Sequence, residues 1–186
     1  MRVLGISGSL RRNSHNTRLL RAAAELFPAD VEFELYDELK SVPPYDEDDD
    51  VTPAPEAVDR LRAAIAAADA ILISTPEYNG SVPGQLKNAI DWASRPRGTP
   101  VLLNKPAAVV GASTGAFGAV WAQAELRKVL AAAGARVVEG EVAVGHAPTR
   151  FDETGELLDE NLREPLAEVV ESLVASAAER EQLVAA

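Results

Sequence analysis

Hydroxyl, amide and arginine side chains gather in one short segment near the amino end of the chain. Residues 5–17, GISGSLRRNSHNT, contain Ser7, Ser9, Ser14, Asn16 and Thr17 together with Arg11 and Arg12. Where a strand passes into a helix, free backbone N–H groups and the positive end of the helix dipole favour anions. Charge-assisted hydrogen bonds contribute about 1.5–3 kcal/mol each, so this segment suits a phosphate monoester. An ordinary loop with serine and asparagine helix caps is the structural alternative.

The segment fits neither of two common phosphate-binding motifs. A Walker A loop needs G-x-x-x-x-G-K-[ST], and the dinucleotide fingerprint begins G-x-G, whereas Gly5 here is followed by Ile6, Ser7 and Gly8. Hydroxyls and arginine take the place of a glycine-rich turn, which favours a terminal phosphate over a pyrophosphate.

A second segment, TPEYNGSVPGQLKNAIDW at residues 75–92, is rich in turn residues. Pro76, Asn79, Gly80 and Pro83 predict a rigid, irregular path. Such a turn can point N–H and C=O groups at the edge of a flat heterocycle, while Tyr78 supplies an aromatic face. A structural turn with a surface tyrosine is the alternative.

A third segment, GASTGAFG at residues 111–118, combines glycine with Ser113 and Thr114. Small residues let a ring approach the backbone closely, and the two hydroxyls can donate to carbonyl oxygens. Glycine-rich loops of this kind are common, so this segment indicates a binding site only together with the two segments described above.

The charge distribution also indicates an anion site. The 186 residues include 18 Lys and Arg against 29 Asp and Glu, a formal net charge of −11, yet residues 1–24 contain five arginines and no acidic residue. The acidity excludes a broad basic surface for nucleic acid. No apolar run approaches the roughly 18 residues of a membrane helix, so we expect a soluble protein without a membrane partner. A leader peptide could also begin with basic residues, but VLGIS is too short for a signal sequence.

Several other chemistries are excluded. The chain has no cysteine, which removes disulfides, thiolate metal sites and thiol catalysis. The acidic run at residues 46–50 lacks the spacing and the glycine of an EF-hand. His15 and His146 are the only histidines, and no Ser-His-Asp arrangement suggests itself, so we predict neither a metal site nor a catalytic side chain.

Short β-rich runs and helical stripes alternate along the chain and must position these loops. The expected strands are residues 2–6, 31–36, 70–75 and 107–113, followed by a short pair, RVV and VAV, around Gly140. The helical stripes include Leu19 to Leu26, Val58 to Ala68, Leu126 to Ala133 and Leu162 to Leu173. Nearly continuous apolar runs at residues 70–75 and 107–113 are typical of central parallel strands.

This order predicts an α/β fold of the flavodoxin-like, doubly wound kind. We expect one domain over residues 1–186, a five-stranded parallel sheet in the order 2-1-3-4-5, and helices on both faces. The tail at residues 179–186 is expected to be a frayed helix end. Ligands of such sheets bind beyond the carboxyl ends of the strands, between the first and third. The three unusual segments follow the first, third and fourth strands.

On these segments the chain resembles the NAD(P)H-dependent FMN reductase family, a flavodoxin-like group that includes chromate, quinone and azo-dye reductases. The motifs GSLRRNSHN and TPEYNGSVPGQLKNAIDW carry the resemblance, which extends over nearly the whole chain. Many relatives carry a second glycine directly after the one matching Gly118, whereas Ala119 stands there in this chain.

The resemblance implies an FMN site with three parts. The phosphate would be bound by Ser9, Arg11, Ser14, Asn16 and Thr17. The ring would lie, largely through backbone contacts, on Pro76, Glu77, Tyr78, Asn79 and Gly80, with Ser113 and Gly115 at its other edge.

It also implies a function. NADPH or NADH would pass a hydride to N5 of FMN, and a quinone, azo, nitro, metal-oxyanion or free-flavin acceptor would then take the electrons in a ping-pong cycle. A cytoplasmic homodimer or homotetramer would be typical of the family. Two alternatives remain: a flavodoxin-like electron carrier reduced by a protein partner, which the acidic surface would suit, and a sensor of a phosphate-bearing ligand without flavin.

Overall fold

The computed structural model describes residues 1–152 and 154–185, and its centre is a parallel sheet. The main strands are β1 (Arg2–Ser7), β2 (Glu32–Tyr36), β3 (Ala70–Thr75) and β4 (Pro106–Ala112). Two short strands, β5 (Arg136–Val137) and β6 (Ala143–Val144), both pair with β4 in the parallel sense. The order β2-β1-β3-β4-β5 confirms the predicted flavodoxin-like topology.

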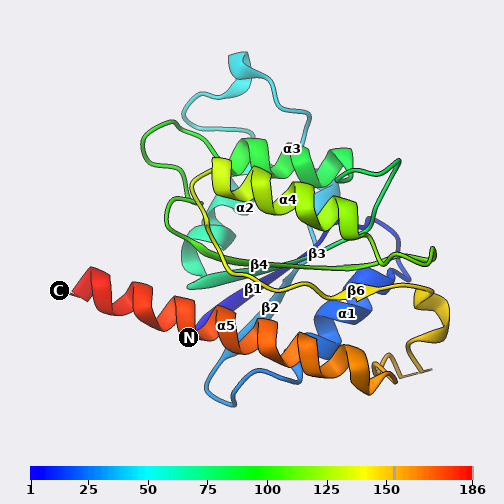
Figure 1. Cartoon of the computed structure of the whole chain (residues 1–186). Helices are drawn as coiled ribbons and strands as arrows, with labels where there is room; N and C mark the ends of the chain where they lie inside the picture. The colour runs from blue at the N-terminus through cyan, green and yellow to red at the C-terminus, as the bar shows by residue number, and fades with distance from the viewer. Residues whose placement is uncertain (153, 186) are drawn as a thin grey trace.

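Helices cover both faces of the sheet (Figure 1). One face packs against α2 (Glu56–Ala67), α3 (Gly84–Ala93) and α4 (Val120–Ala132), and the other against α1 (His15–Ala24) and α5 (Glu160–Ala185). Alternate side chains of each strand enter the two apolar layers: Leu4 and Ile6 of β1 join the first, and Val3 joins the second. Short 3₁₀ turns at η1 (Leu39–Ser41), η2 (Glu47–Asp49) and η3 (Ala147–Thr149) interrupt the connecting loops.

The burial of each strand explains the apolar pattern of its sequence. Every residue of β3 and β4 is buried, as their continuous apolar runs predicted, whereas β2 lies at the edge and is half-exposed. The fifth strand of the predicted sheet is divided into β5 and β6, which residues 138–142 separate. The helix that we expected to fray from residue 179 continues to Ala185. No helix within the described ranges is long and apolar enough to cross a membrane.

Candidate active site

The loops that follow β1, β3 and β4 meet at the carboxyl ends of these strands and enclose a cleft. Its lining consists of Ser9, Arg11, Ser14, His15, Asn16, Pro76, Glu77, Tyr78, Ala112, Ser113 and Thr114. Eight of the twelve predicted site residues are therefore brought together. The other four, Thr17, Asn79, Gly80 and Gly115, adjoin these residues in the chain but do not line the cleft.

The first loop is held against the third strand by a close approach of backbones. The Gly8 amide donates to the Ser74 carbonyl at 2.8 Å. A Cβ atom at Gly8 would lie 2.7 Å from Leu86 Cδ2 and 3.2 Å from Pro76 Cδ, so only glycine fits here without a shift of its neighbours. The residues that precede helix α1 therefore lie beside the loop after β3.

The loop contains a helix cap as well as hydroxyls directed at one another. Ser14 Oγ accepts hydrogen bonds from the amides of Asn16 and Thr17 at 3.1 and 3.3 Å, which makes Ser14 the N-cap of α1. Thr17 Oγ1 donates to Ser7 Oγ at 3.0 Å. The structural reading of this loop as a capped helix start is therefore correct for Ser14, and its hydroxyl hydrogen is still available to a ligand.

Four arginines lie in or near this loop. Among the described residues, no carboxylate lies within 4.0 Å of the guanidinium groups of Arg11, Arg12, Arg18 or Arg21. Glu25 and Glu156 line the hollow on the outer side of Arg12, Arg18 and Arg21, whereas Arg11 lines the cleft itself. A positive charge in this position attracts anionic ligands.

The second loop turns through a tight hairpin. Asn79 and Gly80 both have positive φ, 55° and 75°, and Tyr78 and Ser81 exchange backbone hydrogen bonds of 3.1 and 3.2 Å. This is the two-residue type I′ turn that Asn-Gly favours. In the described part of the chain the amides of Asn79 and Gly80 donate to no backbone or side-chain acceptor, so they are free for a ligand.

Two carboxylates fasten this hairpin to helix α4. Glu77 Oε2 accepts from the amides of Trp121 and Ala122, each at 3.1 Å. Glu125 Oε2 accepts from Ser81 Oγ at 2.6 Å and from the Val82 amide at 3.4 Å. The Ser81 hydrogen bond, helped by the Val82 amide, lowers the pKa of Glu125, so this carboxylate stays charged at neutral pH.

Glu77 supplies a cap that helix α4 lacks locally. The residue before α4, Ala119, has a left-handed conformation (φ 64°) and no side-chain acceptor. The Glu77 carboxylate therefore neutralises the positive end of α4 from a loop more than forty residues earlier in the chain. Sequence reasoning placed Glu77 beside a ring but missed this contact, because it is fixed only by the tertiary fold.

The third loop is held by the short strand β6. The Ser113 amide donates to the Val144 carbonyl at 3.0 Å, and the His146 amide donates to the Gly115 carbonyl at 2.9 Å. Gly118 has φ 59°, and a Cβ atom there would lie 2.2 Å from the Ala143 carbonyl carbon. Backbone packing against β6 therefore explains the glycine at this position.

Asn16 occupies the centre of the site but its side chain is engaged by the framework. Its Nδ2 donates to the Ala112 carbonyl at 3.0 Å, while Oδ1 accepts from the Ala112 amide at 3.0 Å and from Ser74 Oγ at 2.8 Å. The residue is only 3% exposed. Its predicted contact with a phosphate stays a prediction, and the observed contacts join α1 to the ends of β3 and β4.

His15 lines the cleft, although no motif in the sequence marked it as a site residue. Its ring stacks near Phe151 with 6.3 Å between centroids, and Nδ1 is buried without a partner in the described part of the chain. Burial, together with the positive charges of Arg18 and Arg11, lowers the pKa of His15. The imidazole is therefore mainly neutral at pH 7.

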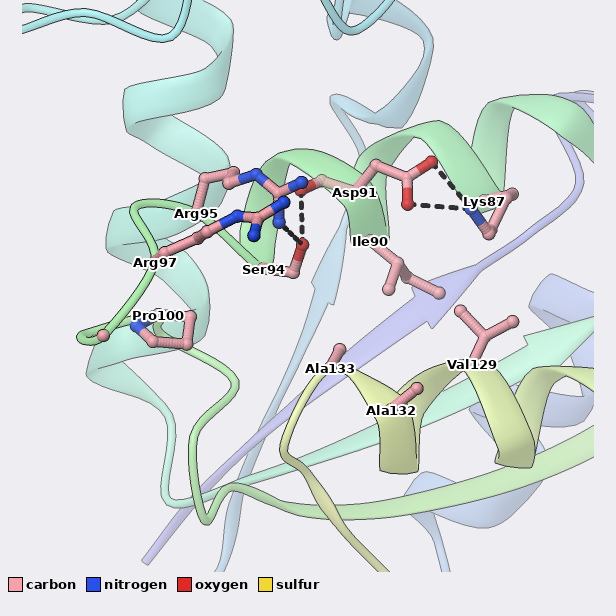
Figure 2. A pocket seen from close by; sticks show the side chains of 11 residues that line it. Lys87, Ile90, Asp91, Ser94, Arg95, Arg97, Pro100, Val129, Ala132 and Ala133 are labelled. Carbon is pink, nitrogen blue, oxygen red and sulfur yellow. Dashed lines mark hydrogen bonds and ion pairs between the residues drawn. The ribbon is translucent and has the colours of Figure 1, made fainter. Parts of the chain in front are cut away.

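A separate hollow of about 460 Å³ lies between the carboxyl-terminal halves of α3 and α4 (Figure 2). There Lys87 pairs with Asp91 at 2.8 Å, and Arg95 lies beside Ser94 and Arg97. None of the predicted site residues lines this hollow. The candidate active site is therefore the cleft at the carboxyl ends of the strands.

Known proteins resemble this chain over most of its length. The sequence pattern of the family described as NADPH-dependent FMN reductase matches residues 1–149. The chain belongs to the NADPH-dependent FMN reductase family. The predicted enzyme type is thereby confirmed, as are FMN and NAD(P)H, the cofactors of that family.

Individual members of the FMN reductase family align over almost the whole chain. An NAD(P)H-dependent FMN reductase of Pseudomonas aeruginosa is 45% identical over 174 residues, 93% of each protein. A 2-hydroxy-1,4-benzoquinone reductase of Burkholderia sp is 41% identical and covers 89% of this chain and 90% of its own. The structure is similar to FerB, a flavoenzyme NAD(P)H:(acceptor) oxidoreductase of Paracoccus denitrificans, with a TM-score of 0.83, 36% identity and coverage of 96% and 97%.

Proposed function

We propose that the cleft binds FMN with its phosphate at the loop before α1. The contacts would come from Ser9, Arg11, Ser14 and Thr17, with Asn16 holding the loop in place. The observation that carries this proposal is the Arg11 guanidinium beside the start of α1, among hydroxyl donors in an acidic molecule, with no ion pair to any described carboxylate. A phosphate monoester matches this donor set in charge and in hydrogen-bonding capacity.

The flavin ring would then lie against the loop after β3. Pro76, Glu77 and Tyr78 line the cleft, and the free amides of Asn79 and Gly80 come next in the chain. Ser113 and Gly115 would lie at the other edge of the ring. Because the hairpin is fastened to α4 by Glu77 and Glu125, its amides are held in place before the ligand arrives, which lowers the ordering cost of binding.

The residues of the cleft act on the reaction by binding and orientation. FMN, when bound, supplies the redox chemistry: it accepts a hydride from NAD(P)H and returns the electrons to an acceptor. Backbone N–H groups at the ring edge would stabilise negative charge that develops there. We assign no side chain as acid or base, since no such role is needed for transfer between two stacked rings.

The acceptor in this proposal is a quinone, azo, nitro, metal-oxyanion or free-flavin compound that takes the place of the oxidised nicotinamide. One open cleft that serves both substrates in turn predicts ping-pong kinetics. Initial rates with NADPH and a benzoquinone varied together should give parallel double-reciprocal lines. Intersecting lines would show that both substrates bind at once and would contradict a shared face.

Anaerobic addition of NADPH separates a reductase from an electron carrier. Prompt bleaching of the bound flavin is expected here. A flavin that stays oxidised under NADPH, but is reduced by a protein donor, would reassign the molecule as a carrier.

The phosphate assignment has a direct test in Arg11→Ala. Loss of a charge-assisted contact should weaken FMN binding about tenfold or more, while riboflavin, which has no phosphate, should bind as before. Arg18→Ala is the matched control, because Arg18 also has no carboxylate partner among the described residues but does not line the cleft. Quenching of flavin fluorescence measures both affinities. Equal losses for FMN and riboflavin would refute the assignment.

We further propose that the protein works as a homodimer or homotetramer. Phe117 and Trp121 pack edge to face with 5.1 Å between centroids, yet they are 65% and 53% exposed. Tyr78, in the hairpin that Glu77 fastens to α4, is 51% exposed. Exposed aromatic side chains in one region are typical of subunit contacts, and light scattering of the purified protein would test this proposal.

A further inference from the structure

The cleft contains an imidazole that has no role in the proposed binding of FMN. His15 is the first residue of helix α1 and directly follows its N-cap, Ser14. It lines the cleft together with Ser9 and Arg11, which are assigned to the phosphate. Its ring lies against Phe151, with 6.3 Å between centroids and 16° between the two planes. The imidazole is therefore part of the wall of the cleft at the start of α1.

The ring of His15 has a hydrogen-bonding atom without a partner. Its Nδ1 is buried and bonds to no group in the described part of the chain. A buried polar atom without a partner destabilises a protein, so a ligand that engages this ring gains affinity from the contact. A neutral imidazole has one donor and one acceptor, whereas an imidazolium has two N–H donors and suits phosphate oxygens.

Positive charges oppose protonation of His15 in the protein without FMN. Arg18 lies one turn further along α1, and Arg11 lies in the loop after β1. Burial lowers the pKa of His15, and the charges of Arg18 and Arg11 lower it further. The positive end of the α1 dipole acts in the same direction. His15 therefore lies in a positive region whose sign a bound dianion would reverse.

The described carboxylates on neighbouring elements are engaged by other groups. Glu77, from the loop after β3, lines the same cleft but accepts hydrogen bonds from two amides of α4. Beside Phe151 in the chain, Arg150 pairs with Asp159 at 2.6 Å, and Asp152 accepts from amides of its own turn. The loop after β4 contributes only uncharged side chains to the cleft. A bound phosphate would therefore supply the negative charge that a protonated His15 needs.

We propose that His15 is a further partner of the flavin phosphate and takes up a proton from solvent when FMN binds. This inference rests on the proposed function, because it requires the phosphate at the loop before α1. A phosphate monoester carries about −1.5 to −2 charges at pH 7, which outweighs the opposing effect of Arg11 and Arg18 on the ring. The imidazolium then donates a hydrogen bond to the phosphate.

Proton uptake couples the affinity for FMN to pH. Because the pKa of His15 would be higher with FMN than without it, the complex binds more protons than the free protein between the two values. FMN must therefore bind more tightly as pH falls through that range. The phosphate itself becomes protonated with a pKa of about 6, so the gain should be clearest between about pH 6.5 and 8.5. Riboflavin has no phosphate, and its affinity should not change over this range.

Proton NMR of the histidine rings tests the inference directly. The chain has only two histidines, and His146→Gln assigns their signals. His15 should titrate below the ordinary pKa of histidine in the protein without FMN, and saturating FMN should raise its proton affinity about tenfold. Saturating riboflavin should cause no such rise. His146 is the internal control, because it is exposed and does not line the cleft.

Two variants test the same coupling through affinity. The unaltered protein should bind FMN several-fold more tightly at the lower end of this pH range than at the upper end, as measured by quenching of flavin fluorescence. His15→Gln keeps a hydrogen-bonding side chain but cannot gain a charge, so its affinity for FMN should be nearly constant. His146→Gln is the matched control and should retain the full pH dependence.

Three results would overturn the inference. An unchanged titration of His15 on FMN binding would show that the phosphate does not act on the ring. An equal rise with riboflavin would assign the effect to the flavin ring system instead of the phosphate. A pH dependence that persists in His15→Gln would place the proton on another group. In all three cases FMN would still bind, whereas a protein that binds neither flavin would contradict the proposed function itself.

Discussion

Replacing Glu77 tests how the hairpin of the active site is held. The Glu77 carboxylate accepts two backbone hydrogen bonds, from Trp121 and Ala122, at 3.1 Å each. Glu77→Ala removes this acceptor and leaves the start of α4 without a side-chain cap, because Ala119 cannot provide one. Glu77→Gln keeps an oxygen acceptor and removes only the charge.

The expected magnitudes follow from the two parts of this contact. A lost N-cap costs about 0.5–2 kcal/mol, and a charge at a helix start contributes about 0.3–1 kcal/mol. Glu77→Ala should therefore lower the free energy of unfolding by about 2 kcal/mol, and Glu77→Gln by about 0.5–1 kcal/mol. For a chain of this length, 1 kcal/mol corresponds to about 2–4 °C in Tm, so Glu77→Ala should lower Tm by roughly 4–8 °C.

Urea unfolding followed by tryptophan fluorescence measures these changes, since Trp92 lies in the core and Trp121 at the start of α4. Glu139→Gln is the control, because Glu139 is exposed and its carboxylate bonds to no group in the described chain. The FMN affinity of Glu77→Ala should also fall several-fold as the hairpin loses one of its two attachments. A Glu77→Ala protein as stable as the Glu139→Gln control would refute the capping role.

Three further expectations concern the framework of the molecule. Asn16→Ala should lower the free energy of unfolding by about 2–4 kcal/mol, both without and with FMN, because the buried amide and carbonyl of Ala112 lose their partner. Unchanged stability of the FMN-free protein in urea would show that Asn16 acts only in ligand binding. Gly118→Ala should lower the free energy of unfolding by about 2–3 kcal/mol, because the new methyl group would meet the Ala143 backbone. Ala119→Gly should change it by less than about 1 kcal/mol, since relief of left-handed strain offsets a lost buried methyl group. Calorimetric unfolding distinguishes the two variants. Burial, aided by Arg180 and opposed by Asp69, lowers the pKa of Lys105 from 10.5 to about 8. Between these pH values the unfolded chain binds more protons than the folded one, so the free energy of unfolding should rise with pH by at most about 1.4 kcal/mol per unit. Lys105→Met should remove this rise in urea titrations at pH 8, 9 and 10.

Much of the fold could be predicted because its strands are buried on both faces. Residues 70–75 form a strand with the predicted bounds, and the run at residues 107–113 was displaced by one residue. Apolar runs and helical stripes indicate which faces of the strands and helices are buried, and these faces indicate that helices cover both sides of the sheet. The pair of runs around Gly140 was visible, but the sequence does not say that both pieces share one position beside β4.

The grouping of the three loops was predictable, whereas the ligand roles of their residues stay predictions. The arginine and hydroxyl loop, the Asn-Gly turn and the small residues after β4 all lie where the topology placed them. The carboxylate contacts of Glu77 and Glu125 were missed, because they join residues more than forty positions apart. The framework contacts of Asn16 were missed for the same reason, as Ala112 lies 96 positions away.

The gap between β5 and β6 gives protein engineers two separable regions on one edge of the sheet. β6 pairs with Gly111 and Ala112 at the rim of the cleft, whereas β5 pairs with Pro106 and Ala107 at the far end. Changes at residues 143–147 would disturb the loop after β4, because Val144 and Ala147 are buried and their backbone bonds to Ser113, whereas β5 lies away from that loop.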